Sequence, residues 1–155
     1  MNNQIWRSCP KGEQHRNISK FMHMRPEQLA TLNISELSLL FQWVFEIREI
    51  ETAQAIIQED YFDLEVVDKK AGKCQEYVRV YRAQPISAVY HLTAELKGRD
   101  VKKIYLFTFD KFPIADKNAR DQSPLFLELR EFKDTIRFIL ESRAKYRKKI
   151  MLNKK

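Results

Sequence analysis

The apolar residues of this chain recur most regularly between residues 35 and 59, where they predict one long helix. Leucine, phenylalanine, valine and isoleucine side chains return there every three or four residues, which places them in a single stripe on a helix. Asn33-Ile34-Ser35-Glu36 has the form of a capping box at the N-terminal end. At the other end, the acidic pair Glu59-Asp60 is unfavourable to the helix dipole, so this terminus needs another source of stability.

A period of two then replaces the helical period and predicts a β-hairpin. Apolar and polar residues alternate over residues 61–67 and again over residues 74–82, with a glycine in the turn between them. Residues 103–109 are apolar on both faces, as expected of an interior strand. Because a helix between Pro85 and Gly98 separates this strand from the hairpin, the two can pair in parallel through a crossover.

The last helix is predicted from Pro124 to Lys149, because Ser123-Pro124 is a typical helix start and apolar residues then recur at helical spacing. Residues 112–122 predict a loop. Together these elements predict the α+β class. A small three-stranded sheet, formed by the hairpin plus one strand, packs against the long central helix and the C-terminal helix.

The chain is predicted to have three regions: a basic N-terminal arm over residues 1–25, a single α+β domain over residues 26–149, and a basic tail over residues 150–155. A length of 155 residues is that of one domain and allows a buried core without disulfides or metal. The composition, 44% hydrophobic and 32% charged, is typical of a globular protein rather than a disordered one.

The cysteine content and the lack of long apolar segments favour the cytoplasm. Cys9 and Cys74 are far apart in the sequence, whereas small secreted folds carry more cysteines at closer spacing. No apolar run approaches the roughly 18 residues of a membrane span, and residues 1–25 contain no apolar signal region. We therefore expect a cytoplasmic protein without membrane contact.

The net charge of +7 is distributed unevenly along the chain. Residues 1–25 carry a net charge of +4, residues 26–70 carry −7, residues 71–112 carry +4 and residues 113–155 carry +6. An acidic middle is thus flanked by basic ends. This asymmetry favours a polyanionic partner at the basic surface, and the alternative is a solvated charge pattern that keeps the protein in solution.

The C-terminal segment carries the strongest functional signal. From Ser142 onward, seven of the fourteen residues are cationic and none is acidic. Long cations of this kind contact phosphates, and the counterions that they release favour binding. The alternative is that these cations complement the dipole of the last helical turn and end in a solvated tail. The candidate nucleic-acid-binding residues are Arg137, Arg143, Lys145, Tyr146, Arg147, Lys148 and Lys149.

A helix-turn-helix is excluded for residues 26–59, although two helices are predicted to meet there. A recognition helix presents a polar or basic face to the major groove. The second helix here is apolar, and its charged residues are five glutamates against the single cation Arg48. Phosphate would repel such a helix, so any nucleic acid binds elsewhere.

Two loose patterns are compatible with catalysis. Arg16 and His23 are spaced as in sites of RNA cleavage, with histidine as acid or base and arginine as a stabiliser of the phosphorane charge. Glu95-Leu96-Lys97, with Asp63 and Glu65 upstream, resembles the acid-and-lysine spacing of metal-dependent nucleases. Those enzymes need the Glu-x-Lys on a strand beside the aspartate, whereas here it ends a predicted helix. The sequence has neither a glycine-rich phosphate loop nor paired metal ligands.

These observations lead to the hypothesis of a non-enzymatic accessory or regulatory protein. It contacts nucleic acid or a nucleoprotein complex through its basic terminal segments. The first alternative is a protein-interaction module, such as an inhibitor or adaptor, that uses the acidic segment 46–68 or an aromatic face of the sheet. The second is a small ribonuclease-like toxin. No catalytic residue, metal or cofactor is predicted, and the oligomeric state is open. The aromatic residues of the predicted sheet face are Tyr77, Tyr81, Phe107, Phe109 and Phe112.

Overall fold

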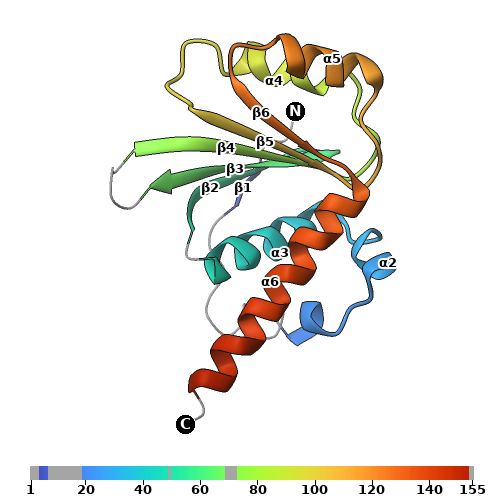
Figure 1. Cartoon of the computed structure of the whole chain (residues 1–155), viewed down its shortest axis with the longest axis vertical. Helices are drawn as coiled ribbons and strands as arrows, with labels where there is room; N and C mark the ends of the chain where they lie inside the picture. Colours follow the sequence, from blue (N-terminus) through green and yellow to red (C-terminus); the bar gives the residue numbers. More distant parts are fainter. Residues whose placement is uncertain (1–3, 7–18, 49, 69–72, 154–155) are drawn as a thin grey trace.

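The computed structural model describes residues 4–6, 19–48, 50–68 and 73–153 of the chain. They form one β-sheet with helices on both of its faces (Figure 1). The strands are β1 (Gln4–Trp6), β2 (Glu51–Ile57), β3 (Tyr61–Asp68), β4 (Lys73–Tyr81), β5 (Lys103–Thr108) and β6 (Phe126–Arg130). The helices are α2 (Pro26–Leu29), α3 (Ile34–Ile47), α4 (Ala88–Glu95), α5 (Ile114–Gln122) and α6 (Phe132–Asn153).

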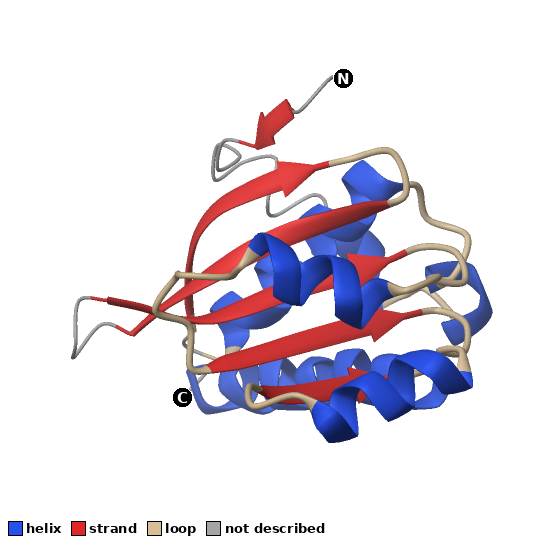
Figure 2. Cartoon of the chain, turned by 90° about the horizontal axis from the view of Figure 1, so that it is seen from above, coloured by secondary structure: helices blue, strands red, loops and turns tan. Residues whose placement is uncertain are grey.

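The strands lie in the sheet in the same order as in the sequence, from β1 at one edge to β6 at the other. Neighbouring strands from β1 to β4 are antiparallel, and β4, β5 and β6 are parallel to one another. The change of direction follows from the connections, because α4 and α5 each carry the chain back across the sheet before the next strand begins. These two helices cover one face, while α3 and α6 lie on the other (Figures 1 and 2).

The larger core lies between the sheet, α3 and α6, and its centre is Phe41 of α3. Its side chain is fully buried, and its ring lies 5.7 Å from that of Phe62 on β3 and 5.2 Å from that of Phe107 on β5, centroid to centroid. The ring of Phe138 on α6 lies 6.3 Å from it. One aromatic side chain therefore joins both helices to two strands of the sheet. The smaller core lies under α4 and α5 and contains Leu92, Ile104 and Leu127 among others.

The predicted start of the central helix is confirmed. The side chain of Asn33 accepts a hydrogen bond from the amide of Glu36 at 2.8 Å, and the Glu36 side chain returns to the Asn33 amide, as in a capping box.

The predicted helix over residues 35–59 is wrong in its second half, because α3 ends at Ile47 and β2 begins at Glu51. The apolar residues of the second half happen to continue the helical spacing, but they alternate equally well with a period of two. In the structure Ala55 and Ile57 are buried opposite Leu64 and Phe62 of β3. The isoleucines and Thr52 in this segment also favour a strand over a helix.

The predicted small three-stranded sheet is therefore wrong, although the chain is α+β. The sheet has five strands, β2 to β6, and the short β1 added at one edge makes it six-stranded. The predicted C-terminal helix contained β6, because Phe126, Leu129 and Phe132 have helical spacing. The predicted loop over residues 112–122 contains α5, whose nine residues Ile114–Gln122 are mostly polar and carry little apolar signal.

Two other sequence predictions are confirmed. Strands β3 and β4 form the expected antiparallel hairpin, and its turn at residues 69–72 lies outside the described residues. Strand β5 lies between β4 and β6 and pairs with β4 in parallel after the α4 crossover. In the described part of the chain, no helix combines the length and the apolar character that a membrane crossing requires. The division into an arm, a domain and a tail stays a prediction.

We predict that replacing Phe41 by alanine lowers the free energy of unfolding by about 3–5 kcal/mol, because the ring leaves a cavity where α3, α6 and the sheet meet. Urea unfolding followed by circular dichroism measures this change. The matched control is Ile86→Ala, since the Ile86 side chain is 78% exposed. A similar loss in both variants would contradict the central position of Phe41.

Candidate nucleic-acid interface

Helix α6 carries all seven candidate nucleic-acid-binding residues, and its first turns are fixed to the end of the sheet. The hydroxyl of Thr135 donates to the carbonyl oxygens of Thr108 at 2.9 Å and Arg130 at 3.1 Å. Ile136 and Ile139 are buried against the larger core. The helix then runs away from the end of β6 beneath the sheet and alongside α3 (Figure 1). One side of α6 is therefore committed to packing along much of its length.

Three of the candidate residues lie on this packed side. Arg143 is 5% exposed, and its Nη1 donates to the carbonyl oxygen of Met24 at 2.7 Å. Burial lowers the pKa of its guanidinium, and the nearby charge of Arg147 adds to that effect. The Tyr146 ring packs edge-on against Trp43 of α3 at 5.6 Å, centroid to centroid.

The third, Lys149, donates from Nζ to the carbonyl oxygen of Ile47 at 3.1 Å, at the C-terminal end of α3. A cation at this position complements the negative end of the α3 dipole. Arg143, Tyr146 and Lys149 thus all join α6 to neighbouring segments.

The other four candidates, Arg137, Lys145, Arg147 and Lys148, are exposed. Among the described residues, none of the four forms an ion pair with a carboxylate. Arg137 and Lys148 are separated by eleven residues, close to three helical turns, so they lie on the same side of α6 about 16 Å apart along its axis. Lys145 and Arg147 flank that line on either side. Four of the seven predicted residues are therefore cations on the solvent side of α6.

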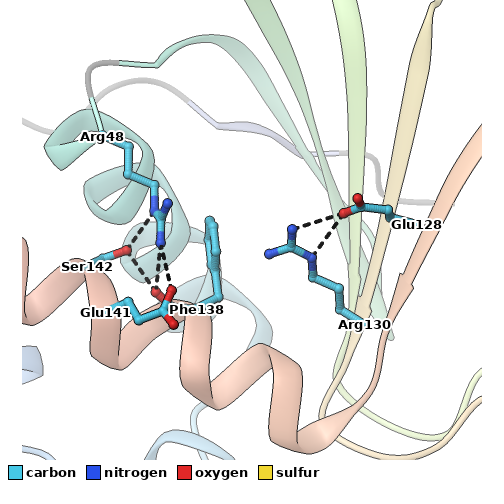
Figure 3. A network of polar contacts seen from close by, with 6 residues as sticks. All are labelled: Arg48, Glu128, Arg130, Phe138, Glu141 and Ser142. Carbon is cyan, nitrogen blue, oxygen red and sulfur yellow. Dashed lines mark hydrogen bonds and ion pairs between the residues drawn. The ribbon is translucent and has the colours of Figure 1, made fainter.

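A groove of about 370 Å³ lies between the start of α6 and strand β6. It is lined by Glu128, Leu129, Arg130, Asp134, Arg137, Phe138 and Glu141. The ring of Phe138 lies between two guanidinium groups, with the Cζ of Arg48 at 4.2 Å and the Cζ of Arg130 at 5.3 Å from its centroid (Figure 3). Arg137 lines the groove and also belongs to the exposed cations, so the two features adjoin.

Most of the acidic groups in the groove already have cationic partners. Glu128 lies 2.9 Å from Nη2 of Arg130 and 3.5 Å from Nζ of Lys103, measured to its carboxylate oxygens. Glu141 lies 3.8 Å from Nη2 of Arg48, whose Nε also donates to the hydroxyl of Ser142 (Figure 3). These pairs neutralise two of the three carboxylates that line the groove.

The acid-and-lysine pattern around Asp63 has a different outcome. Asp63 lies on β3 and is buried, and its carboxylate accepts two hydrogen bonds from Arg79 of β4, at 2.7 and 2.8 Å. The hydroxyl of Tyr77, also on β4, donates to the same carboxylate. Nη2 of Arg79 also donates to Glu95 at the end of α4, at 2.7 Å. The strand beside the aspartate therefore carries tyrosine and arginine, where a nuclease of this type needs glutamate and lysine.

Arg79 is held in its charged form by the other members of the buried network. Burial alone would lower the pKa of Arg79, but the bonds to Asp63 and Glu95 outweigh it and raise that pKa. Burial together with the Asp63 carboxylate also raises the pKa of the Tyr77 hydroxyl well above its usual value. Arg79 stays protonated and occupies the Asp63 carboxylate. Within the described part of the chain, no three His, Cys, Asp or Glu side chains are placed to hold a metal ion.

The remaining sequence candidates are dispersed. His23 is exposed at the end of a short helical segment, and Arg16 lies outside the described residues. The acidic segment 46–68 contributes strands β2 and β3, and its Asp63 is inside the fold. The five aromatic residues predicted for an open sheet face are all buried, with exposed fractions of 9% or less.

Sequence reasoning missed Arg48, Arg130 and Lys103 as parts of the candidate surface. In the sequence, Arg48 is a single cation within a predicted acidic helix, and Arg130 falls inside the predicted C-terminal helix. A signal for Arg130 exists in the alternation of Phe126, Glu128 and Arg130, which gives β6 one polar face.

We predict that Arg79→Met lowers the free energy of unfolding by about 3–5 kcal/mol, because it leaves two carboxylates without their buried cation. Urea unfolding at neutral pH measures the change. Arg99→Met is the matched control, since Arg99 forms a partly exposed ion pair with Glu65 and such pairs contribute about 1 kcal/mol or less. Equal losses of unfolding free energy in the two variants would show that the buried network contributes no more to stability than an exposed ion pair.

The comparisons with known proteins add no further assignment. A scan against protein-family models and a search of curated protein sequences both find no match to this chain.

Proposed function

We propose that this protein is a non-enzymatic accessory or regulatory protein that contacts nucleic acid, or a nucleoprotein complex, through the exposed cations of α6. The supporting observation is that Arg137, Lys145, Arg147 and Lys148 lie on the solvent side of one helix without carboxylate partners among the described residues. A phosphate that meets such a cation replaces only mobile counterions, whose release favours binding.

The packing of α6 supports this proposal energetically. Ile136, Ile139 and the Tyr146–Trp43 contact fix the helix on the domain before any ligand arrives. The backbone of this surface is therefore already ordered, and only side chains lose conformational freedom when a ligand binds. Preorganisation of this kind favours affinity, because ordering a flexible segment would oppose it.

The network around Arg79 lies on the face of the sheet that α4 covers, and it gives no support to the nuclease alternative. It is the buried charged cluster that most resembles a nuclease pattern, and its aspartate is occupied by an arginine. The proposed role therefore involves no reaction step. We further propose that the protein acts in a reducing cytoplasm, which the small number of cysteines, two, supports.

The rival role as a protein-interaction module has less support. The aromatic residues proposed for it are buried, and Glu65 of the acidic segment is engaged with Arg99. The exposed cations of α6 have no such engagement with a described carboxylate, so a polyanion is the partner that fits best.

We predict that a variant with Arg137, Lys145, Arg147 and Lys148 replaced by alanine binds short oligonucleotides at least about tenfold more weakly at moderate salt, because about four phosphate contacts are lost. Fluorescence anisotropy with a labelled oligonucleotide measures the affinity.

The matched control replaces Arg82, Lys97, Lys111 and Arg120 by alanine. This set also has two arginines and two lysines, so the net charge falls equally, but all four residues lie outside α6. Oligonucleotide binding that weakens equally in both variants would show a general charge effect and would contradict a specific role of α6.

A further inference from the structure

Phe126 is an exposed aromatic side chain on the open edge of the sheet. It is the first residue of β6, the last strand of the sheet, and its side chain is 57% exposed. Alternation along β6 directs Leu127 into the smaller core, under α4 and α5, and places Phe126 on the opposite face with Arg130. Helix α6 leaves the sheet at the other end of β6, so it does not cover this position (Figure 1).

Cations and aromatic rings alternate from Phe126 to the groove. Nζ of Lys103 lies 4.8 Å from the ring centroid of Phe126 and 4.5 Å from that of Tyr105, on the neighbouring strand. Cζ of Arg130 lies 5.6 Å from the Tyr105 ring centroid and lines the groove. Arg137 lines the same groove and is one of the four exposed candidate cations on α6. The surface is therefore continuous from an exposed ring on β6 to the cations of α6.

This arrangement matches the chemistry of one polyanion. Single-stranded nucleic acid is bound by cations that follow its backbone and by aromatic side chains on which its unpaired bases stack. In a duplex the bases are already stacked inside the helix and offer no free face to Phe126.

We infer that this surface binds single-stranded nucleic acid, with a base stacked on Phe126 and the backbone following Lys103, Arg130 and Arg137 to the exposed cations of α6. The inference rests on the proposed function and extends it by naming the form of nucleic acid. The groove volume of about 370 Å³ lies within the range of known ligand pockets, roughly 300–1,000 Å³, and leaves room for part of a nucleotide.

The test compares two probes of equal length, a labelled single-stranded oligothymidylate and a blunt duplex, by fluorescence anisotropy. The wild-type protein is expected to bind the single strand more tightly. Phe126→Ala is expected to weaken binding of the single strand about tenfold, because one stacked base is lost, and to leave binding of the duplex almost unchanged. Tyr90→Ala is the matched control, since Tyr90 is 69% exposed on α4, on the other side of the sheet.

A second variant makes the result independent of how well the alanine variant folds. Phe126→Trp retains a stacking ring, so it is expected to keep the affinity for the single strand. Its additional tryptophan fluorescence, taken relative to the wild-type protein, is expected to be quenched by the oligothymidylate and much less by the duplex. An unquenched tryptophan, or equal affinity of the wild type for both probes, would overturn the inference.

The two proposals fail in different ways. If the α6 cations prove necessary but Phe126→Ala binds the single strand as tightly as the wild type, the proposed function stands and the single-strand inference is wrong. If the wild-type protein binds neither probe, both are wrong.

Discussion

The packing of Phe41 between the sheet and α6 is the interaction on which the rest of the structure depends. Its ring meets those of Phe62, Phe107 and Phe138, so one buried side chain fixes the position of α3 and of α6 relative to the strands. The position of the candidate interface follows from how α6 packs. Because Ile139 and Tyr146 are held on the inner side of α6, Arg137 and Lys148, which lie about half a helical turn away, face solvent.

Cations on α6 have two different roles, and burial separates them. Arg143 and Lys149 donate to backbone carbonyl oxygens and join α6 to the rest of the fold. Arg137 and Lys148 lie on the opposite side and are exposed. A basic C-terminal segment therefore both anchors the helix and supplies its charged surface. The buried Arg79 network is a third use of arginine, in which the cation holds α4 against β3 and β4.

The sequence predicted those parts of the fold whose period was unambiguous. The capping box at Asn33 and the β3–β4 hairpin have distinct local signals, and both are present. The prediction failed in the second half of the helix over residues 35–59, because its apolar residues, such as Ala53, Ala55 and Ile57, fit a period of two as well as one of 3.6. Nothing such as glycine or proline marks the end of α3 at Ile47. The acidic Glu59-Asp60 end, unfavourable for a helix, was the available sign of the error.

The candidate surface was predictable as a cluster of charge but not as a geometry. Local sequence identifies the cations of α6, whereas their division into buried and exposed groups depends on which side of the helix meets α3. The contacts of Arg48 depend on the packing of α3 against α6, and those of Arg130 and Phe126 depend on the pairing of β6 with β5. No local pattern encodes either arrangement.

The central claim, that exposed α6 cations contact phosphates, predicts a specific salt dependence of binding. For the wild-type protein and a single-stranded oligonucleotide, four contacts predict that the logarithm of the binding constant falls against the logarithm of salt concentration with a slope of about −3. A slope near zero would contradict the claim.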